Sequence, residues 1–283
     1  MSEPSFSHGI EAPRVSVLPG EGLRFARYAA DADLRGTVES YWTLDVERPP
    51  AVLTVIPDGL VDLTFDVGAR PAAYVTGAVT RPERYVHEHP VSLLGVSLQP
   101  GAALPVLGAD VASLPAGWTP LSKVVGQVAG ELAARLAAAA PVHARLALLD
   151  TFLAARLRGA LPDDRVQVAV GAILRRAGDV DVVRLARDSA ASPRHLGRLF
   201  DAWIGIGPKR FARIVRVQAA LRRLADEPDA DLTTLAVQLG FADHAHLTRE
   251  VRDLAGAAPT VVARQLGLDD AAVSFKREGP AGS

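Results

Sequence analysis

The stretch that decides the fold is Leu235-Ala-Val-Gln-Leu-Gly-Phe241, which is followed by Leu247-Thr-Arg249 and by Gly256-Ala-Ala-Pro259. Apolar residues at helical spacing stop at the glycine of the first stretch and resume after Asp243, a strong N-cap residue. This pattern is typical of two helices joined by a tight turn. We therefore predict a helix–turn–helix unit over about residues 232–254.

The same unit occurs a second time, upstream in the chain. Leu196-Gly-Arg-Leu-Phe-Asp-Ala-Trp-Ile-Gly205 matches Leu247-Thr-Arg-Glu-Val-Arg-Asp-Leu-Ala-Gly256 at a constant offset of 51 positions. Ser192 is a good N-cap and Pro193 suits the first helical position, so the second helix of this earlier unit begins there. An internal repeat of this kind predicts that one fold unit is used twice.

A long amphipathic helix is predicted between the two units, over Pro208–Ala225. Apolar residues recur along one face of it at helical spacing, which is typical of a helix that packs on a core. Its other face is basic: Lys209, Arg210, Arg213, Arg216, Arg222 and Arg223.

With both units and their connecting helix in place, residues 179–264 resemble the DNA-binding domain of the AraC/XylS family of bacterial transcription regulators. The motifs that carry the resemblance are the three stretches quoted first, together with the repeat. The resemblance implies a C-terminal all-α domain with two helix-turn-helix units, which binds double-stranded DNA. A regulator of this kind also contacts RNA polymerase when it activates transcription.

Recognition helices enter the major groove by their N-terminal halves, where exposed side chains reach base edges. From this docking and from the family's base-reading positions, we predict as base readers Arg194, Gly197, Arg198, His244, Ala245, His246 and Arg249. The predicted phosphate contacts are Ser192, Lys209, Arg210, Arg213, Arg216 and Thr248. The alternatives are a structural or phosphate role for one of the two equivalent arginines, Arg198 and Arg249, and a merely solvated face for the basic side chains of the long helix.

The first half of the chain has the pattern of short strands separated by turns. The predicted strands span residues 40–46, 51–57, 60–67, 72–76 and 92–99. Two helices over 121–139 and 142–157 follow, and they either cover the strands or form part of a dimer seam. The expected fold class is α+β: a β-barrel or jelly-roll-like domain with flanking helices, followed by the all-α domain. The expected divisions are a sensor domain over 1–158, a linker over 159–164, the DNA-binding domain over 165–266 and a flexible tail over 267–283.

Residues 20–160 resemble an uncharacterised β domain that often precedes AraC-type units and is related to cupin-like sensor barrels. The resemblance rests on Tyr41-Trp42, Pro57-Asp58-Gly59, Val61-Asp62-Leu63, Gly77 and Gly95-Val-Ser-Leu-Gln-Pro-Gly101. Aromatic side chains of such a domain either line a ligand cavity or belong to the core. The candidates for an effector pocket are Trp42, Phe65, Tyr74 and Tyr85.

Two polar patterns of the first half could indicate a metal site or a pair of catalytic carboxylates, but a structural role explains each of them better. His87-Glu-His89 has the strand spacing of a metal-binding pair, but the later Glu and His ligands of metal cupins are missing, so we expect a surface or loop pair. Asp58 and Asp62 look like paired carboxylates, yet their setting beside Pro57 and Gly59 fits a turn better than acid–base catalysis.

Composition limits the function classes. The net charge is −1, which excludes a uniformly basic surface, but residues 1–162 carry −3, residues 163–264 carry +3 and the remainder −1. The chain has no cysteine, which excludes thiol nucleophiles and with them a DNA repair methyltransferase that shares this DNA-binding unit. No targeting or membrane-spanning segment is evident, so we expect a cytoplasmic protein.

The function predicted from the sequence is a sequence-specific DNA-binding transcription regulator, without catalytic residues, metal or cofactor. Its expected partners are double-stranded DNA, RNA polymerase, a small-molecule effector in the first domain and a second copy of the chain as a homodimer. The alternative is a cupin-type metalloenzyme with helical decoration, which requires a complete set of metal ligands.

Overall fold

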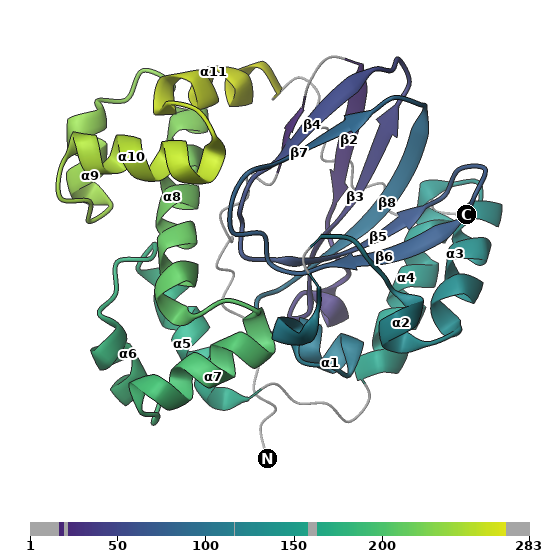
Figure 1. The fold of residues 1–283 in the computed structure, drawn as a ribbon, viewed down its shortest axis with the longest axis horizontal. Helices are drawn as coiled ribbons and strands as arrows, with labels where there is room; N and C mark the ends of the chain where they lie inside the picture. Colours follow the sequence, from purple (N-terminus) through teal and green to yellow (C-terminus); the bar gives the residue numbers. More distant parts are fainter. Residues whose placement is uncertain (1–16, 20–21, 116, 158–162, 270–283) are drawn as a thin grey trace.

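The computed structural model describes residues 17–19, 22–115, 117–157 and 163–269 (Figure 1). It shows the expected α+β architecture, with a β-rich first half and a helical second half. The start of the chain, residues 159–162 of the predicted linker and residues 270–283 of the predicted tail lie outside the described residues. No described helix is long and apolar enough to cross a membrane.

The strands of the first half form two sheets that face each other. A small sheet has the order β1-β4-β7 and a larger one the order β2-β3-β8-β5-β6-β9, with antiparallel pairing throughout. The strands are β1 (Val17–Pro19), β2 (Leu23–Tyr28), β3 (Val38–Val46), β4 (Ala51–Val55), β5 (Val61–Asp66), β6 (Ala72–Thr76), β7 (Glu83–His87), β8 (Val91–Leu98) and β9 (Thr119–Pro120). The five predicted strands are present as β3, β4, β5, β6 and β8.

Side chains of the larger sheet alternate between two environments, because successive residues of a strand point to opposite faces. On β5, Leu63 and Phe65 are fully buried in the core beneath the helices, whereas Asp62 and Thr64 face the small sheet. On β3, Tyr41 points to the helices and Trp42 to the small sheet. This alternation gives the domain one core beneath the helices and a second, mostly apolar interior between the sheets that also contains a few polar side chains.

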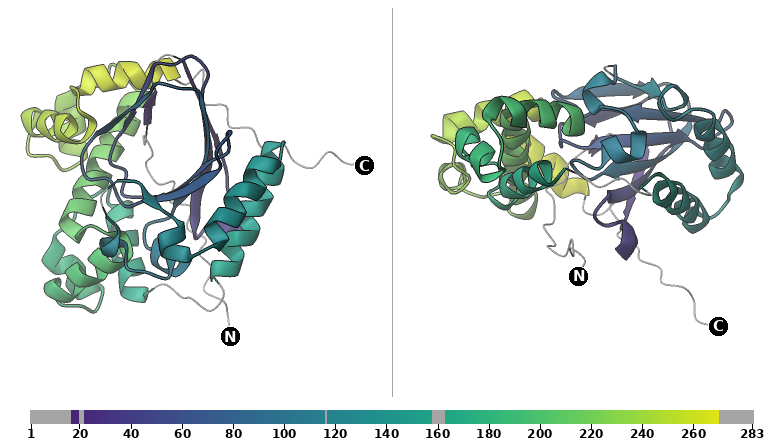
Figure 2. Two further views of the ribbon diagram at one scale, coloured as in Figure 1. Left: turned by 45° about the vertical axis from the view of Figure 1, so that its right-hand side comes forward. Right: turned by 90° about the horizontal axis from the view of Figure 1, so that it is seen from below.

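Helices cover the outer face of the larger sheet (Figure 2). The predicted helix over 121–139 is in fact two helices, because the backbone of Gly126 ends the first one with a φ of +81°. On α4, Asp150 accepts a hydrogen bond from the hydroxyl of Tyr41. The predicted cover of the barrel is therefore what these helices provide. Their bounds are α1 (Ala103–Leu107), α2 (Ser122–Val125), α3 (Val128–Ala138) and α4 (Val142–Leu157).

The second half contains the two predicted helix–turn–helix units, close to the expected bounds. Ser192 accepts a hydrogen bond from the backbone N–H of His195, and Asp243 accepts one from His246, so both predicted N-caps form. Gly205 and Gly256 end the second helix of each unit in the left-handed conformation. The helices are α5 (Asp164–Arg175), α6 (Val182–Asp188), α7 (Pro193–Ile204), α8 (Pro208–Asp226), α9 (Leu232–Gln238), α10 (His244–Ala255) and α11 (Pro259–Asp269).

The two halves share an apolar contact. Ile56, from the turn between β4 and β5, is buried in the same cluster as the helices of the second half. α7 packs against α1 and against the short 3-10 helix Val111–Ser113, and Gly205 lies directly over Val111. The helical half therefore lies against the barrel, on the side away from α3 and α4 (Figure 2).

Candidate functional site

The second helices of the two units, α7 and α10, lie near opposite ends of α8 (Figure 1). α8 contains 19 residues. At a rise of 1.5 Å per residue it is roughly 28 Å long, which is close to the ~34 Å between successive turns of one DNA groove. One rigid helix thus sets the spacing of two potential groove-reading helices.

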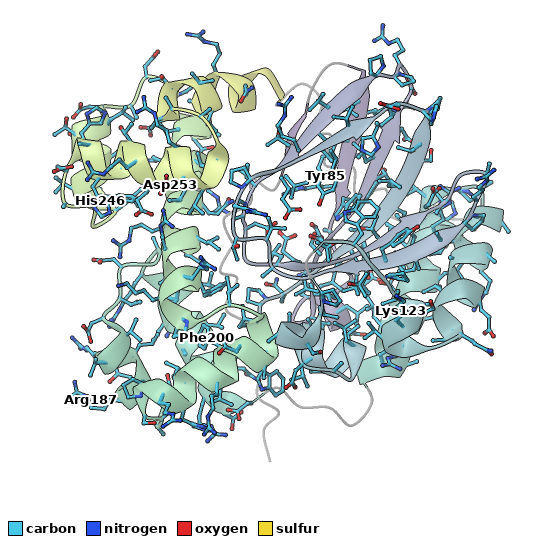
Figure 3. The ribbon with its side chains drawn as sticks, viewed as in Figure 1. Tyr85, Lys123, Arg187, Phe200, His246 and Asp253 are labelled. Atoms are coloured by element: carbon cyan, nitrogen blue, oxygen red, sulfur yellow. The ribbon has the colours of Figure 1, made fainter. Side chains whose placement is uncertain are left out.

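The first turns of α7 and α10 are open to solvent. Arg194 and Arg198 are exposed on α7, as are His244, Ala245 and Arg249 on α10. Figure 3 shows His246, on the first turn of α10, at the side of the molecule opposite the barrel. Most of these exposed positions carry basic side chains.

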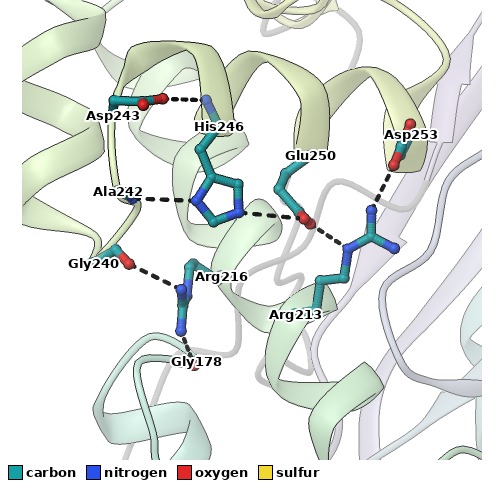
Figure 4. A network of polar contacts seen from close by, with 9 residues as sticks. All are labelled: Gly178, Arg213, Arg216, Gly240, Ala242, Asp243, His246, Glu250 and Asp253. Carbon is teal, nitrogen blue, oxygen red and sulfur yellow. Dashed lines mark hydrogen bonds and ion pairs between the residues drawn. The ribbon is translucent and has the colours of Figure 1, made fainter.

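Arg216 connects the two units instead of projecting outward (Figure 4). Its guanidinium donates to the carbonyl oxygens of Gly240 and Gly178, both at 2.9 Å, and lies 3.3 Å from the carboxylate of Asp179. It also lies over the ring of Phe241, 5.6 Å from the centroid. Gly178 precedes the first unit and Gly240 is the turn of the second, so one side chain of α8 holds both.

Arg213 and His246 are engaged within the second unit. Arg213 forms ion pairs with Glu250 and, at 2.8 Å, with Asp253, and these carboxylates raise the pKa of the guanidinium against its burial. His246 Nδ1 accepts from the backbone N–H of Ala242, and Nε2 lies 3.5 Å from Glu250. Figure 4 shows these contacts as one network.

The remaining predicted contacts differ in exposure. Lys209 and Arg210 are exposed at the start of α8, and Arg210 also lines a groove beside Glu83 of the barrel. Ser192 is exposed as the cap of α7, and the hydroxyl of Thr248 is buried without a hydrogen-bond partner among the described residues.

A second feature is a cavity between the two sheets of the barrel. Its volume is about 70 Å³. Trp42 and Tyr85, two of the four predicted pocket residues, line it, whereas Phe65 lies in the core on the opposite face of its sheet. Tyr74 is in ring contact with Trp118, which also lines the cavity, with centroids 5.2 Å apart.

Charged side chains meet at this cavity. Asp62 Oδ1 accepts hydrogen bonds from Ser97 (2.5 Å) and Trp42 Nε1 (3.3 Å), and burial, with the charge of Asp58, raises the pKa of Asp62 to about 7. Burial lowers the pKa of Arg27, against the raising effect of Asp58 and Asp62. The expected turn role holds for Asp58, which accepts from the backbone of Leu60 at 2.9 Å, but Asp62 faces the cavity instead.

His87 is a correction to the sequence analysis. It does not lie in a surface loop with His89, because it ends β7 and lines the cavity, and its Nε2 is buried without a hydrogen-bond partner among the described residues. Burial lowers its pKa, so the imidazole is neutral at pH 7. Within the described part of the chain, no group of three or more His, Asp or Glu side chains is placed to hold a metal ion.

Comparison with known families decides the identity of the helical half. Residues 185–265 match the family model described as a helix-turn-helix domain, and residues 26–116 match a domain of unknown function, DUF6597. The C-terminal region is an AraC-type helix-turn-helix domain. An AraC-type domain supports a DNA-binding transcription regulator.

Among solved structures, the chain is similar to several of ToxT from Vibrio cholerae. One, at 1.65 Å resolution, has 6% identity and a TM-score of 0.41 over 88% of this chain and 98% of that one. The unsaturated fatty acid bound form has 8% identity and a TM-score of 0.38 over 89% and 96%. No curated protein matches the chain.

The sequence located α7 and α10 of the AraC-type domain but missed most of the cavity. Arg27 and Phe25 lie two residues apart on β2, a strand absent from the prediction, and so share one face of the sheet. The alternation of Leu23-Arg-Phe-Ala-Arg-Tyr28 could have indicated that strand. Trp118 gave no sequence signal, because a two-residue strand, β9, places it.

Proposed function

We propose that the chain binds a specific DNA site through the first two turns of α7 and α10, and that a molecule in the barrel cavity controls this binding. The observation that carries the first part is the exposure of Arg194, Arg198 and Arg249 on helices held apart by α8. Arginine pairs with the O6 and N7 acceptors of guanine, so guanines are expected opposite these side chains.

The other predicted readers and phosphate contacts follow from the same docking. His244 and Ala245 are exposed beside Arg249, and Gly197 lets the first turn of α7 approach the groove closely. Lys209, Arg210 and the capped helix N-termini are the proposed phosphate contacts. His246, Arg213, Arg216, Ser192 and Thr248 stay predictions as DNA contacts, and their intramolecular positions favour a supporting role.

The test is selection of a binding site from random DNA, followed by affinity measurements with variants at moderate salt. Each bidentate contact is worth about 1–3 kcal/mol, so Arg198→Ala with Arg249→Ala should weaken binding at least about 30-fold. Arg252→Ala, at an exposed position on the last turn of α10, is the control and should bind as the wild type does. Binding by the double variant within threefold of the wild type would overturn the assignment of these readers.

Control by the cavity rests on one turn of the chain. β4 and β5 both line the cavity, and in the turn between them Ile56, Pro57 and Gly59 contact the AraC-type domain. Gln218 of α8 donates to the carbonyl oxygen of Pro57 at 2.6 Å, and the ring of Phe211 lies against Gly59. A molecule that moves β4 and β5 therefore moves a turn seated on the helix that spaces the two readers, which biases the equilibrium between DNA-binding arrangements.

The wider organisation belongs to the same proposal. Residues 1–158 form the regulatory domain and 165–266 the DNA-binding domain, and RNA polymerase and a second copy of the chain stay predicted partners. The chain acts as a regulator, without catalysis of its own. A cupin-type metalloenzyme would need several metal ligands that converge on one point. Among the described histidines, His87 is the one that lines the cavity.

A further inference from the structure

The cavity between the sheets is small and has aromatic walls. A volume of about 70 Å³ has room for on the order of five water-sized groups, so its occupant is compact. Trp42, Tyr85 and Trp118 line it, and the rings of Tyr85 and Trp118 lie 5.8 Å apart. The faces of such rings attract cations, tryptophan most strongly.

The charge at the cavity is unbalanced. Arg27 already has two electrostatic partners, Asp58 and Asp62, and its guanidinium lies 5.5 Å from the ring centroid of Phe25. Above pH 7, where Asp62 is ionised, two carboxylates thus lie near one guanidinium, of which Asp62 is the one that lines the cavity, and His87, which is neutral there, contributes no charge. A cation in the cavity completes the neutralisation, whereas an anion increases the excess of negative charge.

The position of Asp62 at the cavity suits a hydrogen-bond acceptor for such a ligand. Ser97 and Trp42 both donate hydrogen bonds to Asp62 Oδ1. Gly95 opposite makes space for the Trp42 ring, because a Cβ there would lie 2.0 Å from Trp42 Cε2. The Asp62 carboxylate and His87 Nε2, which is buried without a hydrogen-bond partner among the described residues, supply the polar contacts that a small amine requires in an otherwise apolar site.

We propose that the barrel cavity binds a compact organic cation, an ammonium group on a small apolar body, with Asp62 as its charge partner and Trp42, Tyr85 and Trp118 as its walls. This inference deepens the proposed control of DNA binding and rests on it only for its biological role. Binding of the cation itself is a property of the barrel.

The experiment compares three probes that share one body: tert-butylammonium, tert-butanol and pivalate. Binding to the full chain is followed by tryptophan fluorescence, with Trp203, which packs on the helical core, replaced by phenylalanine. The cation should bind at least about tenfold more tightly than the alcohol, and pivalate should not bind. Equal binding of alcohol and cation, tighter binding of pivalate, or no saturable response to the cation would each overturn the proposal.

A pH series tests the role of Asp62. The groups that face it are Arg27, Asp58, Tyr85 and His87; burial raises the pKa of Tyr85 to about 12, so Tyr85 stays neutral over the series. Burial lowers the pKa of His87, and its contribution is separated from that of Asp62 by the Asp62→Asn variant below. With Asp62 titrating near pH 7, the cation should bind about tenfold more tightly at pH 8 than at pH 6. A flat profile would overturn the assignment of Asp62 as charge partner.

The matched variants are Asp62→Asn and Asp66→Asn, both on β5. Asp62→Asn removes a carboxylate that lines the cavity, and Asp66→Asn removes one that lies outside it. Asp62→Asn should lose the preference for the cation and its pH dependence, and Asp66→Asn should keep both. Since the probe comparison needs no substitution at Asp62, it decides the proposal even if Asp62→Asn fails to fold. DNA affinity is measured separately: a bound cation without effect on DNA binding contradicts ligand control and leaves the cation site intact.

Discussion

At the scale of single residues, the basic side chains of the AraC-type domain divide into two groups. Arg194, Arg198 and Arg249 are exposed on the first two turns of α7 and α10, whereas Arg213 and Arg216 bond within the domain. Net charge alone does not separate these groups, because both carry the same guanidinium. The hydrogen-bond partners of each side chain are what separate them.

Arg216→Met should destabilise the chain by about 2–4 kcal/mol, because two hydrogen bonds from a charged donor to the backbone carbonyls of Gly178 and Gly240 are lost. Urea unfolding of the full chain measures the effect. Arg223→Met, at an exposed position of the same helix, should change the free energy of unfolding by less than about 0.5 kcal/mol. Equal effects of the two substitutions would contradict the bridging role of Arg216.

Asp62 should make stability depend on pH. In the folded chain its pKa is raised to about 7, whereas the unfolded carboxyl titrates near 3.9. The folded state therefore binds more protons between about pH 4 and 7, and this group lowers the free energy of unfolding as pH rises through that window. Asp62→Asn should gain stability relative to the wild type over the same window, by on the order of a few kcal/mol.

Urea midpoints at several pH values check this prediction, with Asp66→Asn as the control on the same strand. The gain should level off above pH 7. A constant difference between Asp62→Asn and the wild type from pH 4 to 8 would contradict a raised pKa at Asp62.

At the scale of elements, the turn between β4 and β5 connects the barrel to α8. Gly59 has a φ of +77°, and a Cβ there would lie 2.7 Å from the ring of Phe211. Both features favour glycine, because a side chain would strain the backbone and push against the helix. A residue with a side chain at this position would therefore not fit against α8.

Gly59→Ala should destabilise the full chain by about 1–3 kcal/mol and loosen the contact between the halves. Thermal unfolding and small-angle scattering measure the two effects. Gly77→Ala is the control, because nothing lies within 4 Å of its Cβ position. Unchanged stability and scattering in Gly59→Ala would refute the close seating of this turn on α8.

At the scale of the whole molecule, α8 determines where the two readers can meet DNA. A helix does not stretch, so the separation of α7 and α10 is fixed by its roughly 28 Å length. We expect a selected DNA site with two half-sites about one helical turn apart.

Insertion of five base pairs between these half-sites rotates one by about half a turn and should reduce affinity to that of a single unit. Fluorescence anisotropy at fixed salt measures this loss, because affinity for DNA depends strongly on salt. Arg249→Ala should then have much less effect on the interrupted site. Full affinity for that site would contradict reading by both units of one chain.

The sequence by itself determined the AraC-type domain, because its signals are local. N-caps at Ser192 and Asp243, helix-ending glycines and apolar spacing act within one or two turns, so the predicted bounds of α7 and α10 agree with the structure to within one or two residues. The strands with strong apolar alternation were predicted for the same reason.

Only the tertiary structure decided which polar side chains face one another. Arg27, Asp62 and His87 are far apart in the sequence and meet because β2, β5 and β7 bring one face of each strand to the same interior. Likewise, the sequence does not distinguish Arg216 from the other basic residues of α8. Its hydrogen bonds to the carbonyl oxygens of Gly178 and Gly240 are visible only in the structure. Long-range contacts set the charge and partners of a side chain, and a local pattern contains no information about them.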